Sequence, residues 1–109
     1  MTSYLKTDGA AAGPRDSVAV TVVETDACHL CADAHDVLDE FARRGYSIEV
    51  TTRDLRSPEG QALMLHHRAA LSPLVLVEGR FFSQGRLSRG KLARLLEDRR
   101  PAQRPARGA

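Results

Sequence analysis

Two cysteines constrain the fold of this chain more than any other feature of its sequence. Cys28 and Cys31 are the only cysteines among 109 residues, and their spacing corresponds to about one turn of a helix. The β-branched run over residues 18–23 is typical of a buried strand. Apolar residues then recur every three or four positions over 30–41, which predicts a helix with one buried face. The cysteine pair therefore lies where a strand passes into a helix.

This position gives the two thiols an expected chemistry. The first turn of a helix has unpaired N–H groups and a partial positive charge, and both stabilise an anion. We therefore expect a lowered pKa for Cys28, and only the thiolate form of a cysteine attacks a disulfide. Cys31 projects from the same side of the helix and can close a short disulfide with Cys28. The negative charge of Asp26 opposes thiolate formation, so the sequence alone leaves the sign of the net shift open.

Length and composition limit the classes of protein to consider. A chain of 109 residues is one domain that can bury a single core. The hydrophobic content of 42% and the charged content of 28% are those of a globular protein. No apolar run approaches the roughly 18 residues of a membrane helix, and the N-terminus has no signal-peptide core. We therefore expect a cytoplasmic protein, where a C-x-x-C pair is more often redox-active or metal-binding than a structural disulfide.

The C-terminal third is strongly basic. Residues 1–79 carry 7 basic and 12 acidic side chains, whereas residues 80–109 carry 9 and 2. Such a surface could meet nucleic acid, an acidic partner or an anionic thiol. Because no aromatic residues lie among the basic residues from Arg86 to Arg107 to stack on bases, we favour a solvated face and tail over nucleic-acid binding.

The first half of the chain predicts a β-α-β unit. Residues 1–16 lack apolar periodicity and are expected to form a flexible leader. A strand over 17–24 is followed by a helix that Thr25 or Asp26 could cap and that ends before Gly45. A second strand is predicted over 46–51. Because one helix joins the two strands, we expect them to be parallel, with a right-handed crossover.

The second half predicts a helix, a hairpin and a final helix. Ser57-Pro58-Glu59 is a helix-start signal, and the apolar residues of this helix are Ala62, Leu63 and Leu65, with Met64 as a further candidate. Strands over 74–77 and 80–83, joined by Glu78-Gly79, predict an antiparallel hairpin. The expected cap of the last helix is Ser88. The domain should therefore span 17–99, followed by a disordered basic tail over 100–109.

This order of elements resembles the thioredoxin fold, and more closely its glutaredoxin branch, because the chain enters directly at the first strand of the β-α-β unit. The stretch from Asp26 to Ala34 (DACHLCADA) is similar to the CHLC type of glutaredoxin-like domain. Leu71-Ser72-Pro73 lies just before the third strand, where that fold places a cis-proline beside the cysteines. The resemblance covers residues 17–98. It implies a three-layer α/β fold, β-α-β-α-β-β-α, with a mixed four-stranded sheet.

The resemblance also implies roles for individual residues. Cys28 would be the nucleophile that forms a mixed disulfide, and Cys31 the thiol that releases the product. Pro73 would face the disulfide through a cis bond, with the backbone of Ser72 pairing with an extended substrate; without the resemblance, Pro73 could simply begin a strand. A protonated His29 would favour the thiolate and raise the reduction potential, but an exposed His29 with little electrostatic effect is an equal alternative.

The glutathione-binding motifs of glutaredoxins are only partly matched. Those proteins commonly have Thr-Val before the proline, and a Gly-Gly pair with an Asp near the third helix. Here Leu71-Ser72 precedes the proline, and Gln84-Gly85 with Ser88 stands at the second place. The N–H group of Gly85, the N-terminus of the last helix and the charge of Arg86 could still bind a carboxylate. We therefore expect no tightly bound cofactor, with glutathione or another low-molecular-weight thiol as co-substrate.

Zinc binding is the main alternative use of a C-x-x-C pair. The two cysteines would supply two ligands, and the sequence has four histidines. His66 and His67 are adjacent and point to different faces of a helix, so they cannot easily bind one ion together. We therefore predict no metal site.

Taken together, these features predict a small thiol–disulfide oxidoreductase that cycles between dithiol and disulfide. Its substrates would be proteins that carry a disulfide, and its electrons would come from an NADPH-dependent reductase or a small thiol. The alternative is a non-catalytic redox-sensing or binding module whose disulfide alters a partner contact. We expect a monomer without a membrane partner.

Overall fold

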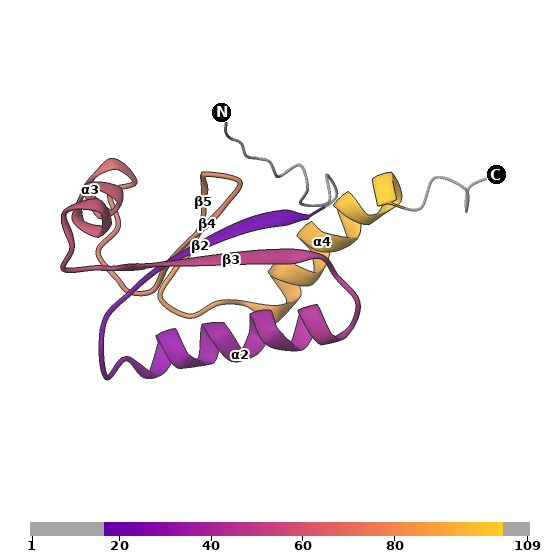
Figure 1. The fold of residues 1–109 in the computed structure, drawn as a ribbon, viewed down its shortest axis with the longest axis horizontal. Helices are drawn as coiled ribbons and strands as arrows, with labels where there is room; N and C mark the ends of the chain where they lie inside the picture. Colours follow the sequence, from indigo (N-terminus) through magenta and orange to yellow (C-terminus); the bar gives the residue numbers. More distant parts are fainter. Residues whose placement is uncertain (1–16, 104–109) are drawn as a thin grey trace, which may run out of the picture.

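The computed structural model describes residues 17–103. Its helices and strands follow one another in the expected order. The elements are β2 (Val18–Glu24), α2 (His29–Arg43), β3 (Ile48–Asp54), α3 (Pro58–His66), β4 (Leu74–Val77), β5 (Arg80–Gln84) and α4 (Arg89–Gln103) (Figure 1). The expected leader over 1–16 and the end of the expected tail, 104–109, lie outside the described residues. The predicted β-α-β-α-β-β-α order is therefore confirmed.

The four strands form one mixed sheet in the order β3-β2-β4-β5. β2 pairs in parallel with β3 and antiparallel with β4, and β4 forms an antiparallel hairpin with β5. Glu78 and Gly79 form the hairpin turn with φ of 56° and 80°, the left-handed conformation that a tight two-residue turn requires. The strand pairings agree with those predicted for the β-α-β unit and the hairpin.

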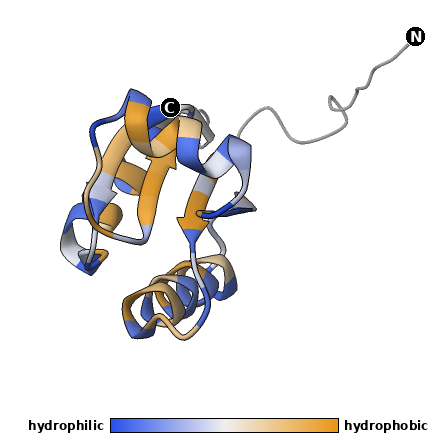
Figure 2. Ribbon diagram, turned by 90° about the vertical axis from the view of Figure 1, so that its left-hand side faces the viewer, coloured by the Kyte–Doolittle hydropathy of each residue, from blue (hydrophilic) through white to orange (hydrophobic). Residues whose placement is uncertain are grey.

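The sheet separates two hydrophobic clusters and so forms the middle of three layers. On one face, β2 and β4 pack against α2 and α4, with Val20, Leu38 and Leu92 at the centre. On the other face, Val23, Leu74 and Leu76 pack against the smaller helix α3. Figure 2 shows largely hydrophobic strands, while the helices carry hydrophobic and hydrophilic residues side by side. The larger cluster fixes α2, the helix that carries the cysteines.

The second strand of the unit begins two residues later and ends three residues later than expected. We predicted a strand over 46–51 from its alternating apolar residues, but β3 spans Ile48–Asp54 and matches the full length of β2. Six of its seven residues are exposed, because β3 is the edge of the sheet and is held by its backbone pairing with β2. Side-chain pattern alone could not locate an edge strand that buries so little.

Helix α3 begins as predicted, but only part of its apolar set meets the core. Ser57 is its N-cap, with Oγ accepting a hydrogen bond from the N–H of Gly60 at 3.0 Å. Leu63 and Met64 pack against the sheet, whereas Leu65 is 79% exposed, and Ala62 is also exposed. The helix is short and covers only one end of the sheet, so one turn of it meets the core.

Helix α4 continues past the expected domain boundary. Ser88 lies before its first residue and accepts a hydrogen bond from the N–H of Lys91 at 3.1 Å, as expected of a cap. The helix runs to Gln103, so residues 100–103 are helical where we expected the tail to begin. Across the described residues, no helix combines the length and apolar character needed to cross a membrane.

Candidate active site

Cys28 itself is the N-cap of α2. Its backbone is extended (φ −111°, ψ 108°), and its Sγ accepts a hydrogen bond from the N–H of Cys31 at 3.1 Å. The sulfur thus takes the place that a serine or aspartate oxygen has in most helix caps. The prediction that Thr25 or Asp26 caps this helix is wrong. Residues 26–27 form a turn, so the residue directly before the helix is Cys28. A thiolate on Cys28 would lie directly at the helix N-terminus.

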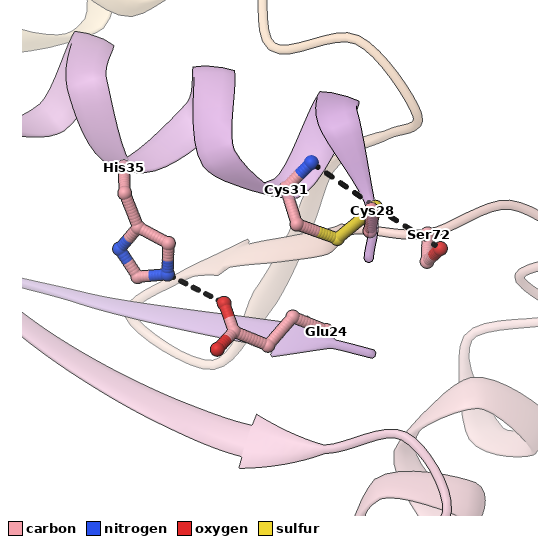
Figure 3. Close-up of a disulfide and its surroundings, with 5 residues drawn as sticks. All are labelled: Glu24, Cys28, Cys31, His35 and Ser72. Atoms are coloured by element: carbon pink, nitrogen blue, oxygen red, sulfur yellow. Dashed lines mark hydrogen bonds and ion pairs between the residues drawn. A yellow bond between two sulfur atoms is a disulfide. The ribbon is translucent and has the colours of Figure 1, made fainter. Parts of the chain in front are cut away.

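The two cysteines form a disulfide, with their Cα atoms 5.2 Å apart (Figure 3). Their burial differs. Cys31 is 4% exposed and belongs to the buried face of α2, while Cys28 is only half-buried. An incoming disulfide therefore reaches Cys28 more readily than Cys31, which is the asymmetry needed if one sulfur attacks and the other resolves.

The acidic residue near the cysteines has a cationic partner. Asp26 accepts a hydrogen bond from Arg56, with Oδ2 3.0 Å from Nη2, and both side chains are exposed. Arg56 also lies 3.7 Å from Asp54 at the end of β3. The positive charge of Arg56 offsets the negative charge of Asp26, which we expected from the sequence to oppose formation of a Cys28 thiolate.

The proline loop lies beside the disulfide. The Ser72–Pro73 peptide bond is cis, and Pro73 is fully buried. Ser72 Oγ lies 3.7 Å from Cys28 Sγ, although 44 residues separate the two in sequence (Figure 3). The cis bond and the placement of this loop at the cysteines agree with what the resemblance implied. Leu30 and Leu71 leave exposed apolar surface, at 39% and 58%, on the segments that carry Cys28 and Ser72.

Gln84 holds this loop, and the sequence analysis did not give it that role. Its Oε1 accepts hydrogen bonds from the backbone N–H groups of Ala70 at 2.8 Å and Leu71 at 3.0 Å. The next residue, Gly85, donates its N–H to the carbonyl of Pro73 at 2.9 Å. Gln84 lies opposite Leu74 in the β4–β5 register, so the hairpin brings it beside the loop. The hairpin pattern was the one signal in the sequence that could have placed it.

Glu24 and His35 form a second pair that the sequence analysis did not assign. His35 Nε2 lies 2.5 Å from Glu24 Oε1, and both side chains are about one-third exposed (Figure 3). Both line a shallow pocket of about 430 Å³ whose other walls include Cys28 and Cys31. His35 follows Cys31 by four residues on a helix, and that spacing was a usable sequence signal. His29 lines the same pocket and is exposed.

Comparison with known proteins identifies the fold of this chain. No protein-family model matches the sequence, and no curated protein matches it either. A solved thioredoxin-like protein from Clostridium perfringens, itself uncharacterised, matches with a TM-score of 0.59 and 14% identity, over 84% of this chain and 78% of that one. A protein of unknown function from Staphylococcus aureus matches with a TM-score of 0.58 and 17% identity, over 76% and 91%. This chain has a thioredoxin-like fold.

Within this thioredoxin-like fold, a second pocket lies between α2 and the start of α4. It measures about 560 Å³, and its lining includes Arg86 and Ser88 together with Asp33 and Asp36. The structure uses two of the groups expected to bind a small thiol for other contacts. Ser88 Oγ caps α4. The N–H of Gly85 donates to the carbonyl of Pro73, so it is not available to bind a carboxylate. Arg86 remains exposed at this pocket.

The metal ligands considered from the sequence are not brought together. In the part of the chain that the structure describes, no three His, Cys, Asp or Glu side chains are grouped to hold an ion. His66 and His67 stack edge to face at the end of α3, with ring centroids 4.7 Å apart. The two cysteines of the C-x-x-C pair are bonded to each other as a disulfide.

Proposed function

We propose that this protein is a thiol–disulfide oxidoreductase of the glutaredoxin-like type, with Cys28 and Cys31 as its redox pair. The observation that carries the proposal is the pairing of a half-buried Cys28 at a helix N-terminus with Ser72 of the cis-proline loop 3.7 Å away. A helix N-terminus stabilises a thiolate, and a loop beside it can hold the substrate chain. Neither feature is needed for a disulfide that only staples the fold.

The reaction follows from the difference in burial between the two cysteines. The Cys28 thiolate attacks one sulfur of a substrate disulfide, forms a mixed disulfide, and releases the other substrate sulfur as a thiolate. Cys31 then attacks Cys28 Sγ, so the Cys28–substrate bond breaks and the second substrate thiol leaves. Two electrons have passed from the dithiol to the substrate, and the protein ends as the Cys28–Cys31 disulfide.

For the electron donor, we propose a low-molecular-weight thiol such as glutathione, or an NADPH-dependent reductase. The pocket beside α4 combines two arginines, Arg86 and Arg89, with two carboxylates, Asp33 and Asp36. Opposite charges in one pocket suit a thiol that carries both carboxylate and ammonium groups. The side chain of Arg89 also pairs with Glu40, which leaves Arg86 as the more available cation.

The test is a coupled assay with a model protein disulfide. Catalytic reduction that is lost in Cys28→Ser, while Cys31→Ser traps a mixed disulfide, would support the oxidoreductase. Stoichiometric oxidation of the pair without turnover would instead support the redox-sensing module. The reduction potential sets the direction of electron flow, since a value near about −270 mV is that of a reductant and one near about −120 mV that of an oxidant.

A further inference from the structure

β3 forms an outer edge of the sheet, and no described residue pairs with its outer side (Figure 1). It spans seven residues and pairs with β2 along its whole length without a bulge. Six of these residues are exposed, among them Val50 at 42%. The strand contains no proline and no lysine, the residues that commonly protect such an edge from further pairing. A second strand can therefore pair with β3 over its full length.

The opposite edge of the sheet, β5, is obstructed. β5 has five residues, and its register against β4 shifts at a bulge between Val75 and Leu76. The carbonyl oxygen of Phe82 already accepts a hydrogen bond from Nζ of Lys91 at 2.9 Å. A bulge and an occupied carbonyl both hinder pairing with a further strand. Of the two edges of the sheet, β3 is therefore the one open to another strand.

The hydrogen bonds at the two ends of β3 show which of its backbone groups face outward. The carbonyl of Ser47 accepts a hydrogen bond from the N–H of Val18, and the N–H of Leu55 donates to the carbonyl of Glu24. Successive residues of a strand point their N–H and C=O groups to opposite sides, so the odd-numbered residues bond to β2. The outward-facing backbone groups therefore belong to the even-numbered residues, which are Ile48, Val50, Thr52 and Asp54.

We propose that β3 pairs in the antiparallel direction with β3 of a second copy of this chain, about a two-fold axis at Thr51. Outward-facing residues must meet outward-facing residues, and in this register Val50 exchanges two backbone hydrogen bonds with Thr52 of the second copy. All seven residues of β3 then have an opposite residue in the second copy. This inference goes beyond the proposed function and does not depend on redox chemistry. It also replaces the monomer that we expected from the sequence, because the exposed edge of β3 became apparent only in the structure.

The charges of β3 favour a second copy as the partner. In the proposed register Glu49 lies opposite Arg53 of the second copy, and the two-fold axis repeats this pair. Both are non-hydrogen-bonded positions, where opposite side chains approach most closely, and opposite charges there stabilise a strand pair. In the single chain, Glu49 has no cationic partner among the described residues, and Arg53 donates to the carbonyl of Thr52 at 3.1 Å. Pairing with a second copy therefore satisfies both charges without breaking another ion pair.

Charge reversal tests the dimer and its register together. Sedimentation velocity of the full-length protein, with a reductant present so that no disulfide joins two chains, should show single chains at about 1 µM and a growing share of dimer toward about 1 mM. Glu49→Arg and Arg53→Glu each place like charges opposite one another twice, so each should raise the dissociation constant at least about tenfold. An equimolar mixture of the two variants should recover most of the wild-type affinity, because in the mixed dimer each arginine faces a glutamate. Arg80→Glu, the same charge change on exposed β5, should dimerise as the wild type does.

Amide hydrogen exchange of the wild type locates the contact without any substitution. The N–H groups of Val50 and Thr52 should exchange more slowly as the protein concentration rises, because in the dimer they donate to the second copy. The N–H of Thr51 faces β2 in the single chain, so its exchange should change much less with concentration.

The proposal is overturned if the wild type remains a single chain at about 1 mM. It is also overturned by a dimer that Glu49→Arg and Arg53→Glu leave equally strong, because another surface would then hold the two copies. A mixture of the two variants that is as weak as its components would exclude the assigned register. Slow exchange of the Val50 and Thr52 amides in a single chain at every concentration would show instead that a segment of the same chain, such as 1–16, covers the edge.

Discussion

A single hydroxyl group beside Cys28 Sγ offers a first prediction at the residue scale. Ser72 Oγ is 3.7 Å from Cys28 Sγ in the disulfide form, close enough to donate a hydrogen bond to a thiolate after reduction. Ser72→Ala removes this donor, so the pKa of the Cys28 thiol should rise. At a pH below that pKa, the alkylation rate of Cys28 should then fall by about three- to tenfold, measured with a small alkylating agent.

Ser83→Ala is the matched control for this substitution. The Ser83 hydroxyl is buried without a hydrogen-bond partner in the described structure, and it lies on β5 rather than in the proline loop. Its removal should leave the reactivity of Cys28 unchanged. An alkylation rate in Ser72→Ala equal to that of the wild type would show that the serine contributes nothing to thiolate stability.

Which site residues could be predicted depended on how they reach the site. Cys28 and Cys31 were found because they form a spaced pair at a strand–helix junction, whereas Pro73 was found through the resemblance, which places a cis-proline before the third strand. Glu24 and Gln84 were not given their roles, because Glu24 meets His35 through the packing of α2 on the sheet and Gln84 reaches the proline loop through the pairing of β4 with β5. The spacing of His35 from Cys31 and the hairpin pattern before Gln84 place these residues near the site, but neither signal names the partner that each one contacts.

At the scale of elements, Gln84 connects strand β5 to the proline loop. Gln84→Ala leaves the N–H groups of Ala70 and Leu71 without their acceptor, which should reduce the free energy of unfolding by about 1–2 kcal/mol. The loss of this hold on the loop should also raise KM for a protein disulfide more than it lowers kcat. Gln84→Glu keeps an acceptor for both groups and should restore most of each property. Urea unfolding and steady-state kinetics measure the two effects.

The junction of β3 with α3 depends on a glycine for space. A Cβ on Gly60 would lie 2.0 Å from the backbone carbonyl oxygen of Asp54, at the end of β3. Gly60→Ala must therefore move the first turn of α3 away from the strand, and we expect a loss of about 1–3 kcal/mol in the free energy of unfolding. Gly90→Ala is the control, because a Cβ there meets nothing closer than Ser88 Oγ at 4.0 Å. It should be neutral or stabilise α4 by up to about 1 kcal/mol.

Equal losses of stability in Gly60→Ala and Gly90→Ala would contradict this account, because they would show that helix propensity rather than close packing decides the effect.

Element order and pairing were predictable from periodicity and turn residues. The limits of β3 and the buried face of α3 were not, since an edge strand and a short helix bury too few side chains to leave a clear pattern.

Across the whole molecule, α2 links the candidate active site to the main core. Its first residues carry the disulfide, its buried face joins the larger hydrophobic cluster, and its last turns are tied to α4. The link between α2 and α4 is the ion pair of Glu40 with Arg89. Glu40 of α2 accepts a hydrogen bond from Arg89 at the start of α4, and it also lies 3.5 Å from Arg44. The position of the cysteines therefore depends on contacts at the opposite end of their helix.

This tie predicts a pH dependence of stability. The hydrogen bond from Arg89, assisted by the charges of Arg89 and Arg44, lowers the pKa of Glu40 below its ordinary 4.5. Because the folded state binds this proton less tightly than the unfolded state, the tie contributes stability above pH 4.5 that is lost as the pH falls through the lowered value. Glu40→Gln should therefore be less stable than the wild type at neutral pH, and the difference should shrink in acid. Unfolding in urea at several pH values measures it, with Glu49→Gln on exposed β3 as the control. A difference that stayed constant down to strong acid would show that Glu40 stabilises the fold by packing and not by its charge.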